Sequence, residues 1–352
     1  WSATNDSPYL YARGRLMNVE AVFTVEPANF ADNITIYGAG PLDFEFTNVT
    51  VFASGGLATY PAKNSIGIFT NYVDFWNPMA INWFVNVGAS SNCYAGSSFN
   101  MIYVCLTDPS AVPTLYHTLV HLACAAGRAT NASEAVSNSW SQLSGHNFTT
   151  WDGKKLYYYK DGEGWNSPTY ISQLLNTGNG NCIAWRNLFR HALKVNGVNS
   201  DYIYIQATSW RNYFIVGDWT FGTASFTNTP PYNWKLQFAT TNVDMVPRPP
   251  GDVYGDLTSL TNIPGQNTAP PSEKVFGNHR MARYNGVYYD PSYGVTHASI
   301  NSFVDAAIDG YAYRKDGDPT TNYVIRTKSA SGVYEIGEWV NDTDIDLIDG
   351  LP

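Results

Sequence analysis

The chain has 352 residues, enough for two or three domains that each bury an apolar core without help from disulfides or metal. Its net charge is −9 and only 14% of its residues are charged, which excludes the clusters of Lys and Arg that nucleic-acid binding needs. No apolar run is long enough for a membrane span, so none is expected.

The composition favours an extracellular or cell-surface location. Aromatic residues reach 15%, and the chain begins at Trp1 without Met, as expected of a secreted protein after signal-peptide removal. Glycosylation sequons lie at Asn5, Asn33, Asn48, Asn131, Asn147 and Asn341.

Residues 1–110 are predicted to form an antiparallel β-sandwich-like module. Between positions 19 and 106, short β-rich runs alternate with Gly, Asn and Pro, which is typical of that architecture. The module would either bind a ligand or serve as a scaffold. Cys93 and Cys105 flank a turn expected at 95–98, so they would either bridge adjacent strands or stay as free thiols.

Residues 111–352 are predicted to form a core of helices packed on an antiparallel sheet. Residues 113–126 have helical spacing, and His117, His121 and Cys124 share one face that could ligate a metal. No fourth ligand follows, so packing explains the pattern better, and we predict neither metal nor cofactor.

Further helices are predicted over residues 133–143 and from Ser167 to about 175, with a hairpin over 149–159 between them. The second of these helices leads into Gly178-Asn179-Gly180-Asn181-Cys182.

Cys182 stands where this Gly and Asn segment gives way to a helix, because apolar residues from Trp185 to Leu193 follow helical spacing. A helix N-terminus favours a thiolate over a thiol, which predicts a nucleophile. The alternative is a small buried apolar residue.

A nucleophilic cysteine needs a base. His191 is nine residues along the same helix and faces away from Cys182. His279 is the better candidate, because Asn285-Gly286 predicts a two-residue hairpin that places His279 diagonal to Asp290 on one face. The pattern thus predicts a His–Asp pair.

Strands at 202–207 and 213–216 are expected in the sheet that carries this pair, and residues 227–271 are expected to be a Pro-rich insertion. The insertion would cover the cleft or be a surface elaboration. A helix over 301–308 and a last hairpin across Ser331-Gly332 complete the prediction.

Over about residues 166–315 the chain resembles the transglutaminase-like superfamily of papain-related cysteine enzymes. The resemblance rests on the Gly-x-Cys before a helix, a following strand, an Asn-His pair and a Tyr-Tyr-Asp-Pro segment. It implies Cys182 as nucleophile, His279 as base and Asp290 as the residue that orients the base. Met281 departs from the pattern, since an aromatic residue commonly stands two positions after the histidine.

The resemblance implies a thiol-dependent hydrolase or acyltransferase that acts on peptide or carboxamide bonds through a thioester. Its partner would be a protein or peptide substrate, attacked by water in a cysteine peptidase or amidase and by an amine in a protein-glutamine acyltransferase. The alternative is a structural or adhesive surface protein that uses this domain as a scaffold and self-associates. A carbohydrate-binding protein is a third reading, since the chain has eleven tryptophans.

Overall fold

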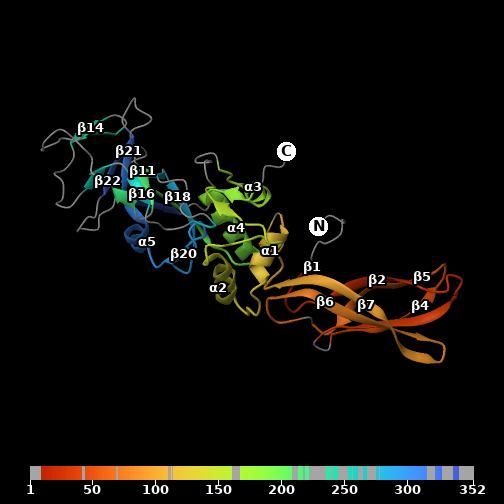
Figure 1. Ribbon diagram of the computed structural model, residues 1–352. Helices are drawn as coiled ribbons and strands as arrows, with labels where there is room; N and C mark the ends of the chain where they lie inside the picture. Colours follow the sequence, from red (N-terminus) through yellow and green to blue (C-terminus); the bar gives the residue numbers. More distant parts are fainter. Residues whose placement is uncertain are drawn as a thin grey trace. The chain divides into compact units, whose positions relative to one another are not determined.

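A computed structural model shows a mixed α+β protein (Figure 1). It describes residues 9–41, 44–68, 70–109, 112, 114–160, 167–207, 213–216, 219–221, 235–238, 241–244, 253–255, 257–260, 265–267, 275–276, 278–314, 322–326 and 336–340. The chain forms two compact units. The first comprises Trp1–Gln142 with His191–Val198, and the second comprises Leu143–Arg190 with Asn199–Pro352.

One seven-stranded sheet dominates the first unit, in the order β1-β7-β6-β3-β4-β5-β2. Its strands are β1 (Tyr9–Ala12), β2 (Asn18–Thr24), β3 (Asp32–Ala39), β4 (Glu45–Ala53), β5 (Leu57–Ile66), β6 (Asp74–Val87) and β7 (Ser90–Cys105). All neighbours are antiparallel except β1 and β7, which are parallel.

This sheet curls over its own core. Trp83 on β6 packs edge-on against Phe23 of β2, with ring centroids 5.5 Å apart, although β6 and β2 are not neighbours in the sheet. Tyr60 of β5 lies 5.4 Å from the same indole. The expected sandwich of two sheets is therefore corrected to a single curled sheet, because the strands β6 and β7 continue unbroken over 14 and 16 residues.

The suggested bridge between Cys93 and Cys105 is wrong. Both residues lie on the continuous strand β7, at its exposed and its buried end, and both are free thiols. The turn expected at 95–98 does not form, because these residues pair with β6. Two cysteines so far apart along one extended strand cannot meet the distance that a disulfide requires.

The two histidines of helix α1 (His117–Cys124) both form hydrogen bonds with one tyrosine. The Tyr103 hydroxyl lies 3.0 Å from Nε2 of His117 and 2.9 Å from Nδ1 of His121, while Cys124 is buried. Among the described residues, no three His, Cys, Asp or Glu side chains come together as a metal site would require.

Helix α2 (Ala132–Leu143) forms where the sequence predicts it. Asn131 caps its start by accepting the N–H of Glu134, whose own carboxylate accepts the N–H of Thr130. Within the described part of the chain, no helix combines the length and the apolar character needed to cross a bilayer.

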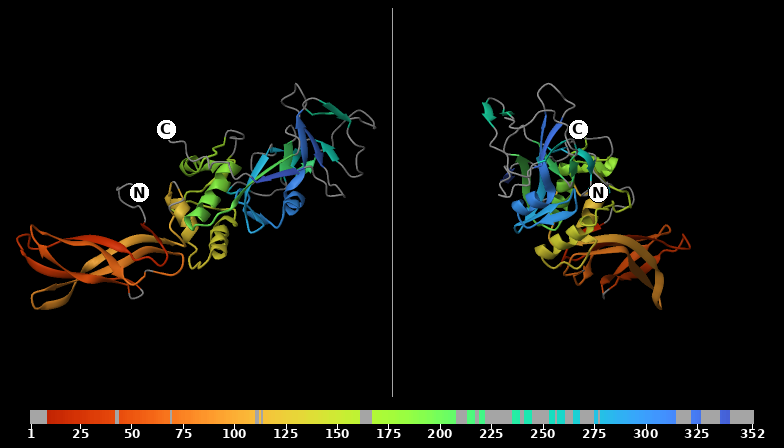
Figure 2. Two further views of the ribbon diagram at one scale, coloured as in Figure 1. Left: turned by 180° about the vertical axis from the view of Figure 1, so that it is seen from behind. Right: turned by 60° about the vertical axis from the view of Figure 1, so that its left-hand side comes forward.

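The second unit packs helices against a five-stranded sheet. The sheet order is β20-β19-β18-β10-β23, from β10 (Asp201–Ala207), β18 (Asn278–Tyr284), β19 (Val287–Asp290), β20 (Val295–His297) and β23 (Ile336–Val340). Before it come β8 (Tyr157–Tyr158), α3 (Ile171–Thr177), β9 (Asn179–Gly180) and α4 (Cys182–Val195). Helix α5 (Ile300–Ala307) follows β20 and contacts it, as Figure 2 shows in blue.

Two strand assignments differ from expectation. Strand β11 (Tyr213–Val216) pairs with β17 (Val275–Phe276) and β21 (Ile308–Arg314), in a separate sheet, not with β10. Strand β22 (Asn322–Arg326) pairs with β21 and with β15 (Val253–Gly255), whereas β23 pairs with β10. The last hairpin does not form as predicted, because short β-rich runs fix strand identity but not partner choice.

The insertion at 227–271 lies mostly outside the described residues. Its described parts include β13 (Lys235–Phe238), β14 (Thr241–Asp244) and β16 (Leu257–Leu260), of which β16 pairs with β12 (Trp219–Phe221). Residues 265–267 are also described, and they return to the helical part of the unit.

The curled core predicts a large effect of Trp83→Ala. The indole is 2% exposed and contacts aromatic rings from several strands, so its removal should lower the free energy of unfolding by about 3–5 kcal/mol. Phe99→Ala is the matched control, because Phe99 is 69% exposed and its loss should change stability by less than about 0.5 kcal/mol. Urea unfolding followed by circular dichroism measures both, and equal effects would contradict the curled core.

Candidate active site

Cys182 is the first residue of α4, as the sequence predicts. Helix α3 ends at Thr177 and is capped by Gly178, whose φ of 79° is the left-handed conformation that favours glycine. Asn181 then caps α4, because its Oδ1 accepts the N–H groups of Ile183 and Ala184 at 3.0 and 3.4 Å. The sulfur therefore sits at the positive end of the helix dipole.

The segment before Cys182 is held on both sides. Asn179 accepts the N–H of Lys160 with its Oδ1 at 2.9 Å, and the Asn181 N–H donates to the Pro168 carbonyl at 2.9 Å. A Cβ on Gly180 would approach Ala184 and Leu174 to 3.0 Å, so only glycine fits this position without a shift. These contacts fix the position of the thiol in the fold.

His279 and Asp290 meet across the hairpin that Asn285-Gly286 forms. The turn pairs Tyr284 with Val287, which is the register expected from the sequence. His279 Nε2 lies 2.6 Å from Asp290 Oδ2, and the other oxygen, Oδ1, accepts the Ser292 N–H at 3.1 Å. The structure therefore brings the predicted His–Asp pair into direct contact.

The pair is fully buried. His279 and Asp290 are 0% and 1% exposed, and Cys182 is 4% exposed. Burial by itself lowers the pKa of His279, but the charge and the hydrogen bond of Asp290 outweigh it, and the neighbouring Cys182 sulfur acts in the same direction. Together they raise that pKa to about 10, so His279 is an imidazolium at neutral pH.

Aromatic rings enclose the imidazole. Phe303 of α5 stacks on it with ring planes 8° apart and centroids 6.0 Å apart, and Tyr293 lies 5.7 Å away. These contacts hold the ring in one orientation. With Asp290 on Nε2, the imidazole has Nδ1 as its second site for a proton.

Arg186 is a component that the sequence interpretation missed. It lies one helical turn after Cys182 on α4, is 3% exposed, and stacks on Tyr202 with its guanidinium carbon 3.5 Å from the ring centroid. Burial lowers the pKa of Arg186 to about 9, so it remains a cation at neutral pH. A cation four residues after the cysteine was a signal available in the sequence.

Gln266 forms hydrogen bonds that join the segments around Cys182, His279 and Asp290. No short-range pattern in the sequence predicted this role of Gln266. Its backbone accepts the N–H of Tyr158 and donates to the carbonyl of Ser292, at 3.0 and 2.9 Å. Its side chain accepts the Phe148 N–H at 3.2 Å and donates to the Leu143 carbonyl at 2.6 Å. One buried residue thus joins β8 to the turn that follows Asp290.

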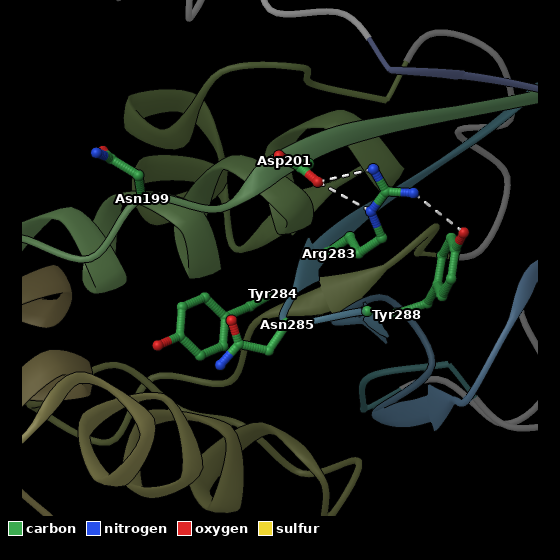
Figure 3. Close-up of a pocket in the computed structure, with 7 residues that line it drawn as sticks. Asn199, Asp201, Arg283, Tyr284, Asn285 and Tyr288 are labelled. Carbon is green, nitrogen blue, oxygen red and sulfur yellow. Dashed lines mark hydrogen bonds and ion pairs between the residues drawn. The ribbon is translucent and has the colours of Figure 1, made fainter.

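A pocket of about 480 Å³ lies elsewhere in this unit (Figure 3). It surrounds the hairpin tip, where Arg283 pairs with Asp201 at 2.8 Å and donates to the Tyr288 hydroxyl at 3.3 Å. His279 is at the opposite end of β18 from this tip, so the pocket is distinct from the triad.

Comparison with known proteins gives no family for this chain. No model of a known protein family matches it, and no curated protein sequence matches it. The functional argument therefore rests on the geometry of the site.

The buried pair predicts a specific dependence of stability on pH. The pKa of His279 is raised from about 6.5 to about 10, so the folded chain keeps a proton that the unfolded chain releases in this window. The contribution of the pair is complete below pH about 6.5 and is lost as pH rises through about 10. We expect the urea midpoint to fall with rising pH more steeply in the wild type than in Asp290→Asn.

The control for this measurement is Asp152→Asn, which removes an exposed carboxylate of the same unit. It should keep the wild-type slope between pH about 6.5 and about 10. Identical slopes in the wild type and in Asp290→Asn would contradict the raised pKa of His279.

Proposed function

We propose that the chain is a thiol-dependent hydrolase or acyltransferase of the transglutaminase-like kind, acting on peptide or carboxamide bonds. The observation that supports it is a cysteine at a helix N-terminus whose sulfur acts on the imidazole of a buried His279–Asp290 pair. Nucleophile, base and orienting carboxylate are the three parts that such chemistry requires.

In the proposed reaction, the Cys182 thiolate bonds to the carbonyl carbon while the electron pair of the C=O bond moves to oxygen. The tetrahedral adduct then returns that pair, the C–N bond breaks, and the leaving nitrogen takes a proton from the His279 imidazolium. Water or an amine attacks the thioester, His279 takes up a proton from it, and the sulfur leaves as the thiolate.

The surroundings of Cys182 support this proposal electrostatically. The helix dipole, the imidazolium of His279 and the buried cation of Arg186 all favour a negative charge on sulfur. Cys182, His279 and Arg186 are each at least nine-tenths buried, so the low local dielectric strengthens the interactions between them.

The decisive test is alkylation of Cys182 by iodoacetamide as a function of pH, read by peptide mass spectrometry. The exposed Cys93 of the same chain is an internal reference. If Cys182 is an activated thiolate, the ratio of the Cys182 rate to the Cys93 rate should rise at least about tenfold as pH falls from about 8 to about 6. In His279→Gln this rise should disappear.

A control and a contrary result complete the test. His117→Gln, which changes a histidine bonded to Tyr103, should keep the wild-type ratio. A ratio that is independent of pH in the wild type would overturn the enzyme proposal. A structural or adhesive surface protein would then be the better reading, and concentration-dependent self-association in solution would be its signature.

A further inference from the structure

Tyr158 stands beside the nucleophile. On β8 it pairs in parallel with Gly180 of β9, two residues before Cys182, and the N–H of the next residue donates to the Gly180 carbonyl at 3.3 Å. Its ring is 0% exposed. The phenol is therefore part of the packed wall around the triad.

The Tyr158 hydroxyl has no hydrogen-bond partner among the described residues, although it is buried. A buried polar group without a partner costs free energy, and native structures keep few of them without a functional reason. Burial raises the pKa of Tyr158 well above its ordinary value, and the charges of Tyr293 and Cys182 add to this rise. The hydroxyl is thus a neutral O–H donor, and the Cys182 sulfur is near enough to act on it electrostatically.

Tyr293 is the other buried phenol, and its ring packs edge-on against that of Tyr158, with centroids 5.0 Å apart. It follows Asp290 in the same turn, with its N–H donating to the Asp290 carbonyl at 3.3 Å, and its ring contacts His279. Tyr158 is instead tied to the backbone that leads into Cys182. Of the two phenols, Tyr158 is therefore the one whose position is fixed by the segment that carries Cys182.

We propose that the Tyr158 hydroxyl is the second oxyanion donor of this site, acting together with the backbone N–H of Cys182. When sulfur bonds to a carbonyl carbon, the oxygen gains the electron pair, and both donors would hydrogen-bond to it. This inference rests on the proposed acyl chemistry and names the group that stabilises its tetrahedral adduct.

The donor is also held rigidly, as an oxyanion site requires. The Tyr158 N–H donates to the Gln266 carbonyl at 3.0 Å, and its ring packs on Gly265 so closely that a Cβ there would lie 2.8 Å from Cδ1. Gly265→Ala should therefore displace the phenol without changing any triad residue.

The test compares two reactions of the same sulfur. Alkylation by iodoacetamide displaces iodide and forms no oxyanion, whereas acylation by p-nitrophenyl acetate passes through one and releases p-nitrophenolate. Tyr158→Phe should lower the acylation rate about 10²-fold to 10³-fold and leave alkylation of Cys182 within about twofold. Tyr157→Phe is the matched control and should leave both rates unchanged, because alternate side chains on a strand point to opposite faces.

Each remaining outcome decides the inference. Unchanged acylation in Tyr158→Phe, or an equal loss of both reactions, would overturn the role of Tyr158 while leaving activated Cys182 intact as a separate finding. A selective loss in Tyr293→Phe alone would assign the donor to Tyr293 instead. Absence of both reactions in the wild type would overturn the proposed function itself. If Tyr158→Phe does not fold, the selective loss of acylation is expected in Gly265→Ala, and its absence there overturns the proposal.

Discussion

The second unit depends on one buried contact, the hydrogen bond between His279 and Asp290. Burying two ionisable groups is costly unless each finds its partner with good geometry, and here the separation is 2.6 Å with a backbone N–H on the second carboxylate oxygen. The hairpin, the turn after Asp290 and the stacked Phe303 all hold this geometry. A shift of any of them would leave a charge buried without compensation.

Cys182 is coupled to that pair through electrostatics and not through sequence proximity. Three sources of positive potential converge near the sulfur: the start of α4, the imidazolium of His279 and the guanidinium of Arg186. Arg186 is stacked on Tyr202 in place of an acidic partner, so its charge is not neutralised by a carboxylate in that contact. Positive potential around the sulfur is the feature that the proposed nucleophile requires.

The first unit gives a contrast. Its curled sheet packs aromatic rings from several strands around Trp83, and His117 and His121 hydrogen-bond to Tyr103. The groups that the proposed reaction uses all belong to the second unit.

The sequence by itself determined the local features on which the site is built. The Gly and Asn segment fixed the start of α4 at Cys182, and Asn285-Gly286 fixed a hairpin whose register brings His279 to Asp290, because both follow from short-range backbone preferences. Only the tertiary structure decided the rest. The curl of the β module, the sheet to which β11 belongs, and the positions of Gln266 and Tyr158 depend on contacts between segments far apart in the chain. Such contacts are selected by packing and by the need to satisfy buried polar groups, and no local pattern encodes them.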